Sequence, residues 1–161
     1  MRHTSRVTTR SFELTTSVPV GPRAAIDFLT DLTRHRGLHP YLVSAEVVAS
    51  GTGPDGPWQE WRVVERPRLG PLRYTIRFPA RVVRDGGTMT SSVRAAPGCT
   101  LRTVTRATPA GDDDGDGTSA LLTETTEVTA PWPVVGYMTR QARAAHERTF
   151  ALLPGELGLL R

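Results

Sequence analysis

Two histidines, His35 and His39, stand four residues apart, and on one helix this spacing would let both rings bind the same zinc ion. Gly37 lies between them and Pro40 follows directly, and both interrupt a continuous helix. A third ligand would have to come from a distant part of the chain, where His146 is the candidate. We therefore predict no metal site and keep His39 as a candidate catalytic group.

An acidic stretch, DDDGDG at residues 112–117, matches the first half of a calcium-binding loop. The closing glutamate of that motif would fall at residue 123, which is Thr, and Glu124 comes one place late. We predict a solvated turn between two strands here. No Gly-rich phosphate loop and no Ser/His/Asp signature is present, so we predict no cofactor. Cys99 stands alone, which excludes an intramolecular disulfide and fits a small buried apolar residue.

The composition is that of an ordinary globular protein, with 161 residues of which 38% are hydrophobic and 22% charged. This length predicts one domain spanning residues 1–161. No apolar run is long enough to span a membrane and the first residues lack a signal-peptide core, so we expect a cytoplasmic protein. The net charge of +4 comes from arginines, since the chain has no Lys. They are spread along the chain, which disfavours a nucleic-acid partner; the oligomeric state stays open.

Residues 72–82 alternate strictly between apolar and cationic or polar side chains. Leu72, Tyr74, Ile76, Phe78 and Ala80 share one parity, as expected for a strand with one apolar face. Further strands are predicted at 8–18, 42–50, 58–66, 88–96, 99–108 and 119–130. A helix is predicted from Pro22 to residue 32 and a short second helix within 33–42. A long helix is predicted after residue 131 and is expected to end at Pro154-Gly155. Its inner stripe comprises Val135, Met138, Ala142, Ala145, Thr149 and Leu153.

This order of elements resembles the START-like superfamily, also called SRPBCC, which includes polyketide cyclases and dehydrases and the birch-pollen allergens. The resemblance rests on LHP at 38–40, VVERPRLGPLRY at 63–74, and TETTEVTAP at 123–131 running into RQARAAHERTFALL at 140–153. It implies an α+β helix-grip fold, in which a curved antiparallel sheet of about seven strands wraps around the long C-terminal helix and leaves an internal cavity.

With such a cavity, parity assigns the inward side chains of each strand when the arginines are placed outside. In residues 58–66 the inward set is Trp61, Val63 and Glu65, although Trp58, Glu60 and Val64 fit nearly as well. The candidate ligand-binding residues are Trp61, Ile76, Phe78, Met89, Ser91, Leu101, Thr103, Thr105, Leu122, Thr126, Met138, Ala142 and His146. This mixed wall favours an oxygenated ring system over a plain acyl chain.

Three candidate catalytic residues follow from the same placement. Burial of Glu124 in an apolar cavity would favour its neutral form and suit it to proton transfer near neutrality. The phenol of Tyr74 could donate a hydrogen bond to a carbonyl or a developing enolate. His39 would stand at the cavity mouth. Two of these residues also have a purely structural interpretation. Glu124 could form an ion pair, and Tyr74 could form a hydrogen bond within the core.

Three functions from different classes remain open. The first is a cyclase or dehydratase of bacterial secondary metabolism that folds a small, oxygenated, polyketide-like molecule in the cavity. The second is a carrier or sensor that binds a small hydrophobic molecule or lipid without chemistry. The third is an interaction module that docks RNA, a ribosome or another acidic partner on Arg73, Arg77 and Arg81.

Overall fold

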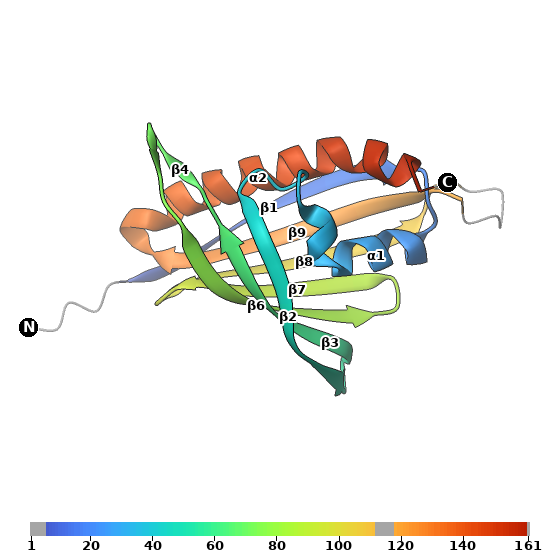
Figure 1. Ribbon diagram of the computed structural model, residues 1–161, viewed down its shortest axis with the longest axis horizontal. Coiled ribbons are helices and arrows are strands. Elements are labelled where there is room, and N and C mark those ends of the chain that lie inside the picture. Colours follow the sequence, from blue (N-terminus) through green and yellow to red (C-terminus); the bar gives the residue numbers. More distant parts are fainter. Residues whose placement is uncertain (1–5, 112–117, 161) are drawn as a thin grey trace, which may run out of the picture.

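The computed structural model describes residues 6–111 and 118–160, so the acidic stretch at 112–117 lies outside the described residues. Figure 1 shows a long sheet with the C-terminal helix running along it and a shorter helix near the C-terminal half of that long helix. The helices are α1 (Pro22–Thr30) and α2 (Trp132–Gly158), with a 3₁₀ turn η1 (Leu32–His35) after α1. The strands of the main sheet are β1 (Val7–Val18), β2 (Leu42–Gly53), β3 (Gly56–Glu65), β6 (Ile76–Asp85), β7 (Thr88–Ala96), β8 (Cys99–Pro109) and β9 (Ala120–Pro131).

The seven strands follow the order β1-β9-β8-β7-β6-β3-β2, and every neighbouring pair is antiparallel. Five of these pairings join consecutive strands of the main sheet, as tight connections favour. The exception is β1, which pairs with β9, so the first and the last strand of the chain lie side by side. Register shifts in β2 and β7 bend those strands and add to the twist of the sheet. This is the helix-grip architecture that the sequence predicts.

The long helix turns its predicted stripe toward the sheet. Val135, Ala145, Thr149 and Leu153 are buried, and the helix packs on β1 and β9. The helix begins beside Pro133, which suits the first turn because its missing N–H would have had no partner there. Among the described residues, no helix combines the length and the apolar character that crossing a membrane requires.

The predicted end of the long helix is wrong. Pro154 and Gly155 lie inside α2, which continues to Gly158. A proline in a helix removes one backbone hydrogen bond and crowds the preceding turn. Leu153 and Leu157 lie on either side of it and both are fully buried, so packing of the last turn outweighs that local cost.

The strand predicted over residues 72–82 begins only at Ile76. Leu72 belongs to β5 (Leu72–Arg73), which pairs with β4 (Arg68–Leu69) in a small separate hairpin. Gly70 has a φ of 59°, in the left-handed region, and allows this turn. Leu72 is consequently 68% exposed and not part of the inner wall. The alternation is confirmed from residue 76 onward, where Phe78, Ala80 and Val82 are buried.

Candidate functional site

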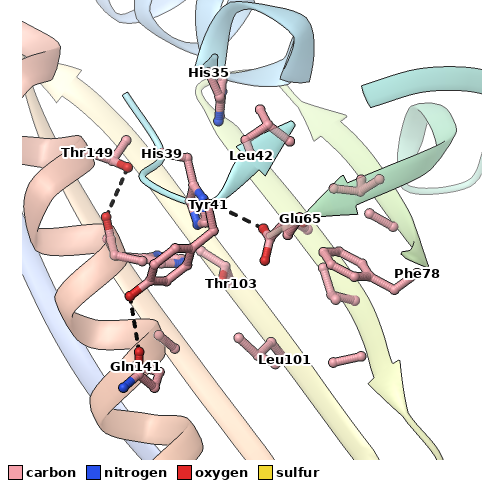
Figure 2. A pocket seen from close by; sticks show the side chains of 18 of the residues that line it. His35, His39, Tyr41, Leu42, Glu65, Phe78, Leu101, Thr103, Gln141 and Thr149 are labelled. Carbon is pink, nitrogen blue, oxygen red and sulfur yellow. Dashed lines mark hydrogen bonds and ion pairs between the residues drawn. The ribbon is translucent and has the colours of Figure 1, made fainter. Parts of the chain in front are cut away.

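A cavity of about 280 Å³ lies between α2 and the sheet. Its walls come from α2, the segment after α1, and strands β3, β6, β7, β8 and β9. One wall is apolar and includes Val63, Ile76, Phe78, Val93 and Leu101. The polar groups gather toward the segment after α1 and the facing turns of α2, and Figure 2 shows them from close by. The cavity therefore offers one apolar region and one polar region to a bound molecule.

The shortest polar contact in this cavity joins a carboxylate to a histidine. Nδ1 of His146, on α2, lies 2.5 Å from Oε1 of Glu124, on β9. The second oxygen of Glu124 accepts a hydrogen bond of 3.3 Å from Oγ1 of Thr105 on β8. An ionised carboxylate only accepts hydrogen bonds, so with Glu124 in that form the contact requires the proton to be on Nδ1 of His146. In the part of the chain that the structure describes, no hydrogen bond occupies Nε2 of His146, which leaves it available to a ligand.

A second carboxyl and histidine face each other without a hydrogen bond. Oε1 of Glu65, the last residue of β3, lies 3.6 Å from Nδ1 of His39, and this nitrogen is buried without a partner. Burial raises the pKa of Glu65 from 4.5 to about 7, although nearby His146 opposes the shift. Burial, together with His146 and His35, lowers the pKa of His39 from 6.5 to about 3. His39 is therefore neutral near pH 7 and is not a cationic partner for Glu65.

Other polar groups define the rest of this region. His35 makes a 3.0 Å contact from Nε2 to the carbonyl of Leu29, and burial lowers its pKa. Tyr41 donates a 3.1 Å hydrogen bond to Oε1 of Gln141, joining the segment after η1 to α2 (Figure 2). The rings of His39 and His146 lie 6.3 Å apart and edge to face, so the two pairs lie close together.

Tyr74 lies at the rim of the cavity. It is 42% exposed, and burial followed by the neighbouring phenol of Tyr137 raises its pKa. The sequence placed Tyr74 on the apolar inner face of a strand, whereas it precedes β6 and lies beside the hairpin of β4 and β5. Its side chain therefore lies at the entrance of the cavity and is partly open to solvent, not buried within the inner wall.

Most predicted site residues do line the cavity. Besides His39, Tyr74, Glu124 and His146, they are Ile76, Phe78, Met89, Ser91, Leu101, Thr103, Met138 and Ala142. Four others are buried but are not part of the lining: Trp61, Thr105, Leu122 and Thr126. Thr105 instead holds Glu124, and Thr126 is hydrogen-bonded to Thr103 at 3.0 Å. Trp61 packs in the core with its Nε1 buried and unpaired, so it is no stacking wall for a ligand.

Several lining residues were not among the predicted site residues. Glu65 was assigned inward by parity but given no role, and Tyr137 and Gln141 were not considered. Both α2 residues lie next to the predicted inner stripe, one position before Met138 and Ala142, so a wider helical face would have included them. Tyr41 and His35 lie in irregular or 3₁₀ backbone, for which parity offers no guide.

The positions of the histidines bear on the zinc site that the spacing of His35 and His39 suggested. Within residues 6–111 and 118–160, no group of three or more His, Cys, Asp or Glu side chains could hold a metal ion. His35 points to the carbonyl of Leu29 and His39 toward Glu65, so the two rings do not converge. The candidate calcium loop at 112–117 lies outside the described residues.

Solved structures share the helix-grip fold of this protein, which is the fold of START-like proteins. A START superfamily protein from Mycobacterium smegmatis has the same fold, with a TM-score of 0.72 and 17% identity over 94% of this chain and 99% of that one. The Zhui aromatase/cyclase from Streptomyces sp. R1128 matches with a TM-score of 0.65 and 16% identity, over 93% of this chain and 92% of that chain.

Norcoclaurine synthase from Thalictrum flavum is a third relative in structure, with a TM-score of 0.59 and 15% identity over 91% of this chain and 94% of that one. No protein-family model matches the sequence, and a comparison with curated proteins finds no match. At these identities the likeness establishes the START-like fold, and the chemistry has to be argued from the cavity itself.

Proposed function

We propose that this protein binds a small, largely hydrophobic molecule that carries a carbonyl group and catalyses proton transfer on it, as a cyclase or dehydratase of bacterial secondary metabolism. The observation that carries the proposal is the contact between His146 and Glu124 on the cavity wall. One fold relative is an aromatase/cyclase and another a synthase, which is consistent with chemistry in a cavity of this kind.

In this proposal His146 is the general base and Glu124 positions it. Glu124 holds the proton on Nδ1, so the lone pair of Nε2 faces the ligand. Nε2 removes a proton from the carbon next to the ligand's carbonyl, and the electron pair of the C–H bond moves to form an enolate. Return of that proton to another atom isomerises the ligand; attack of the enolate carbon on a second carbonyl closes a ring.

This division of roles modifies the sequence-based hypothesis, in which Glu124 itself moved the proton. Both oxygens of Glu124 already have partners, His146 and Thr105, whereas Nε2 of His146 has none among the described residues. Tyr74 stays a candidate donor to the enolate oxygen, because its phenol lies at the rim of the same cavity.

A non-catalytic carrier remains the second candidate because much of the cavity wall is apolar. Val63, Ile76, Phe78, Val93 and Leu101 would hold a hydrophobic molecule without any proton transfer. The two functions differ in one measurable property: only the enzyme accelerates exchange of a carbon-bound proton.

The test uses 2-tetralone, a bicyclic ketone with acidic protons beside its carbonyl. The exchange of these protons for deuterium is followed by proton NMR in D₂O, with protein and with buffer alone. We expect the protein to accelerate exchange by at least about 100-fold over buffer, in the range typical of positioned general bases. His146→Gln should abolish the acceleration, and Glu124→Gln should reduce it.

Glu127→Gln is the matched control for Glu124→Gln, because Glu127 lies on the same strand with its side chain exposed on the other face. This variant should accelerate the exchange of the 2-tetralone protons for deuterium as much as the unchanged protein does. Binding of 2-tetralone without any acceleration would contradict the enzyme and favour the carrier.

A further inference from the structure

The charges around the cavity are distributed very unevenly. The chain has 20 basic residues apart from histidine, all of them Arg, yet no arginine of the described residues lines the cavity. The ionisable side chains that do line it are two carboxyls, three imidazoles and three phenols. A ligand with a carboxylate or phosphate group would therefore be desolvated there without a cation to pair with.

The imidazoles do not supply a compensating positive charge. His39 and His35 have lowered pKa values because they are buried, and are neutral near pH 7. The third imidazole, His146, is already in contact with the carboxyl group of Glu124. Among the described residues, the polar region of the cavity thus has no arginine for an anion, and His146 already pairs with the carboxyl group of Glu124.

Glu65 is the carboxyl group of the cavity lining for which the described residues provide no hydrogen bond. It lines the cavity with a side chain that is 17% exposed, and its closest partner is the uncharged His39 at 3.6 Å. Figure 2 shows its carboxyl between His39 and Phe78, facing the open space of the cavity. The Nδ1 atom of His39 is buried and has no hydrogen-bond partner, so His39 makes no hydrogen bond that would occupy the carboxyl group of Glu65.

We propose that Glu65 selects the charge of the ligand, and that the ligand carries a basic amine that forms an ion pair with Glu65 while its hydrophobic ring system packs on the apolar wall. A protonated amine donates a charge-assisted hydrogen bond to the carboxylate of Glu65, which faces the cavity. This inference rests on the proposed function only in using the same cavity, and it names the substrate class that the cavity accepts.

The protonation state of Glu65 makes the selection depend on pH. Its pKa is raised to about 7 by burial, so the carboxyl is half ionised near neutrality and fully ionised above pH 8. The other titratable groups that line the same cavity are His35, His39 and Tyr41 before β2, Tyr74 before β6, Glu124 on β9, and Tyr137 and His146 on α2. Neither His39 nor Tyr74 changes charge between pH 6 and 8.

The experiment compares three probes with one ring system: 2-naphthylmethylamine, 2-naphthalenemethanol and 2-naphthoate. Their dissociation constants are measured by isothermal titration calorimetry at pH 6 and pH 8. At pH 8 we expect the amine to bind about tenfold more tightly than the alcohol, as a charge-assisted hydrogen bond predicts, and the carboxylate more weakly than both. The preference for the amine should shrink at pH 6, where Glu65 is protonated.

Glu65→Gln tests the assignment to one residue. It should remove the preference for the amine while binding of the alcohol changes less than about twofold, a change that also shows that the variant is folded. The control is Glu60→Gln, on the same strand but in an ion pair with Arg81 on the outer face, and it should keep the preference. Equal or tighter binding of the carboxylate, or an amine preference that survives Glu65→Gln, would overturn the proposal.

The outcomes separate this inference from the proposed function. Accelerated exchange of 2-tetralone without any amine preference would refute the inference alone. An amine preference that depends on Glu65, without accelerated exchange, would refute the enzyme and identify a carrier for basic hydrophobic molecules.

Discussion

Nδ1 of His146 lies 2.5 Å from Oε1 of Glu124, and this contact joins the long helix to the sheet that it packs on. Because Thr105 donates to the other oxygen, the carboxylate is held from both sides, by α2 and by β8. A carboxylate with so little freedom fixes the direction of the imidazole that it contacts. The proposed base is thus oriented by two elements that also form the core.

Thr105→Val tests this support. The change removes the hydroxyl that donates to Glu124 but keeps the shape of a fully buried side chain. We expect the free energy of unfolding to fall by about 1–2 kcal/mol, since a buried acceptor loses a partner. Urea denaturation measures the change. Thr125→Val, whose hydroxyl contacts Glu13 on the exposed face at 3.4 Å, should stay within about 0.5 kcal/mol of the unchanged protein.

Glu65 and His39 should give the folding stability an unusual pH dependence. The pKa of Glu65 is raised in the folded state from 4.5 to about 7, so this group lowers stability as the pH rises through that window. The pKa of His39 is lowered from 6.5 to about 3, so that group raises stability as the pH rises from 3 to 6.5. The two contributions oppose each other between pH 4.5 and 6.5.

Removing the carboxyl should separate the two contributions. We expect Glu65→Gln to be more stable than the unchanged protein at pH 8, by at most about 3 kcal/mol, and to lose this advantage below pH 4.5. Denaturation in urea at a series of pH values measures both curves. Parallel curves for the two proteins would show that Glu65 titrates in the folded state as it does in the unfolded chain.

The sequence predicted the sheet and its long helix because their periodicities are strong. Alternation placed Met89, Ser91 and Val93 on the inner face of β7, where they line the cavity. The stripe on the last helix likewise matches its buried face. These patterns depend only on which side of a regular element a residue lies, which period two or 3.6 determines.

The contacts between different helices and strands could not be predicted from these sequence periodicities. That Glu124 meets His146, and Glu65 meets His39, depends on how the helix and the segment after α1 sit over the sheet. Parity put Tyr74 on a strand that starts two residues later, because a local pattern does not show that residues 68–73 fold back on themselves. Pro154 shows the same limit, since burial of its neighbours holds a helix that the proline would otherwise end.

Gly155 gives a test of that last turn of α2. Its φ is not in the left-handed region, and a Cβ at this position would meet no neighbour, so alanine fits. We expect Gly155→Ala to raise the free energy of unfolding by about 0.5–1 kcal/mol through the lower entropy of the unfolded chain. Gly98→Ala should do the opposite, by about 1 kcal/mol, because Gly98 has a φ of 73° in the turn between β7 and β8. Urea midpoints for both variants decide the signs.

Ala142 offers a way to close the cavity without touching its polar groups. It lies on the inner side of α2 and lines the cavity, whereas Ala144, two residues on, is exposed on the same helix. A tryptophan at 142 would occupy the space that a ring system needs, so we expect Ala142→Trp to weaken binding of 2-naphthalenemethanol by about tenfold or more. Ala144→Trp adds the same side chain to solvent and should leave binding unchanged. If both variants bound the alcohol equally well, the naphthyl ring would have to sit outside the cavity, and the roles given to His146 and Glu65 would lose their common site.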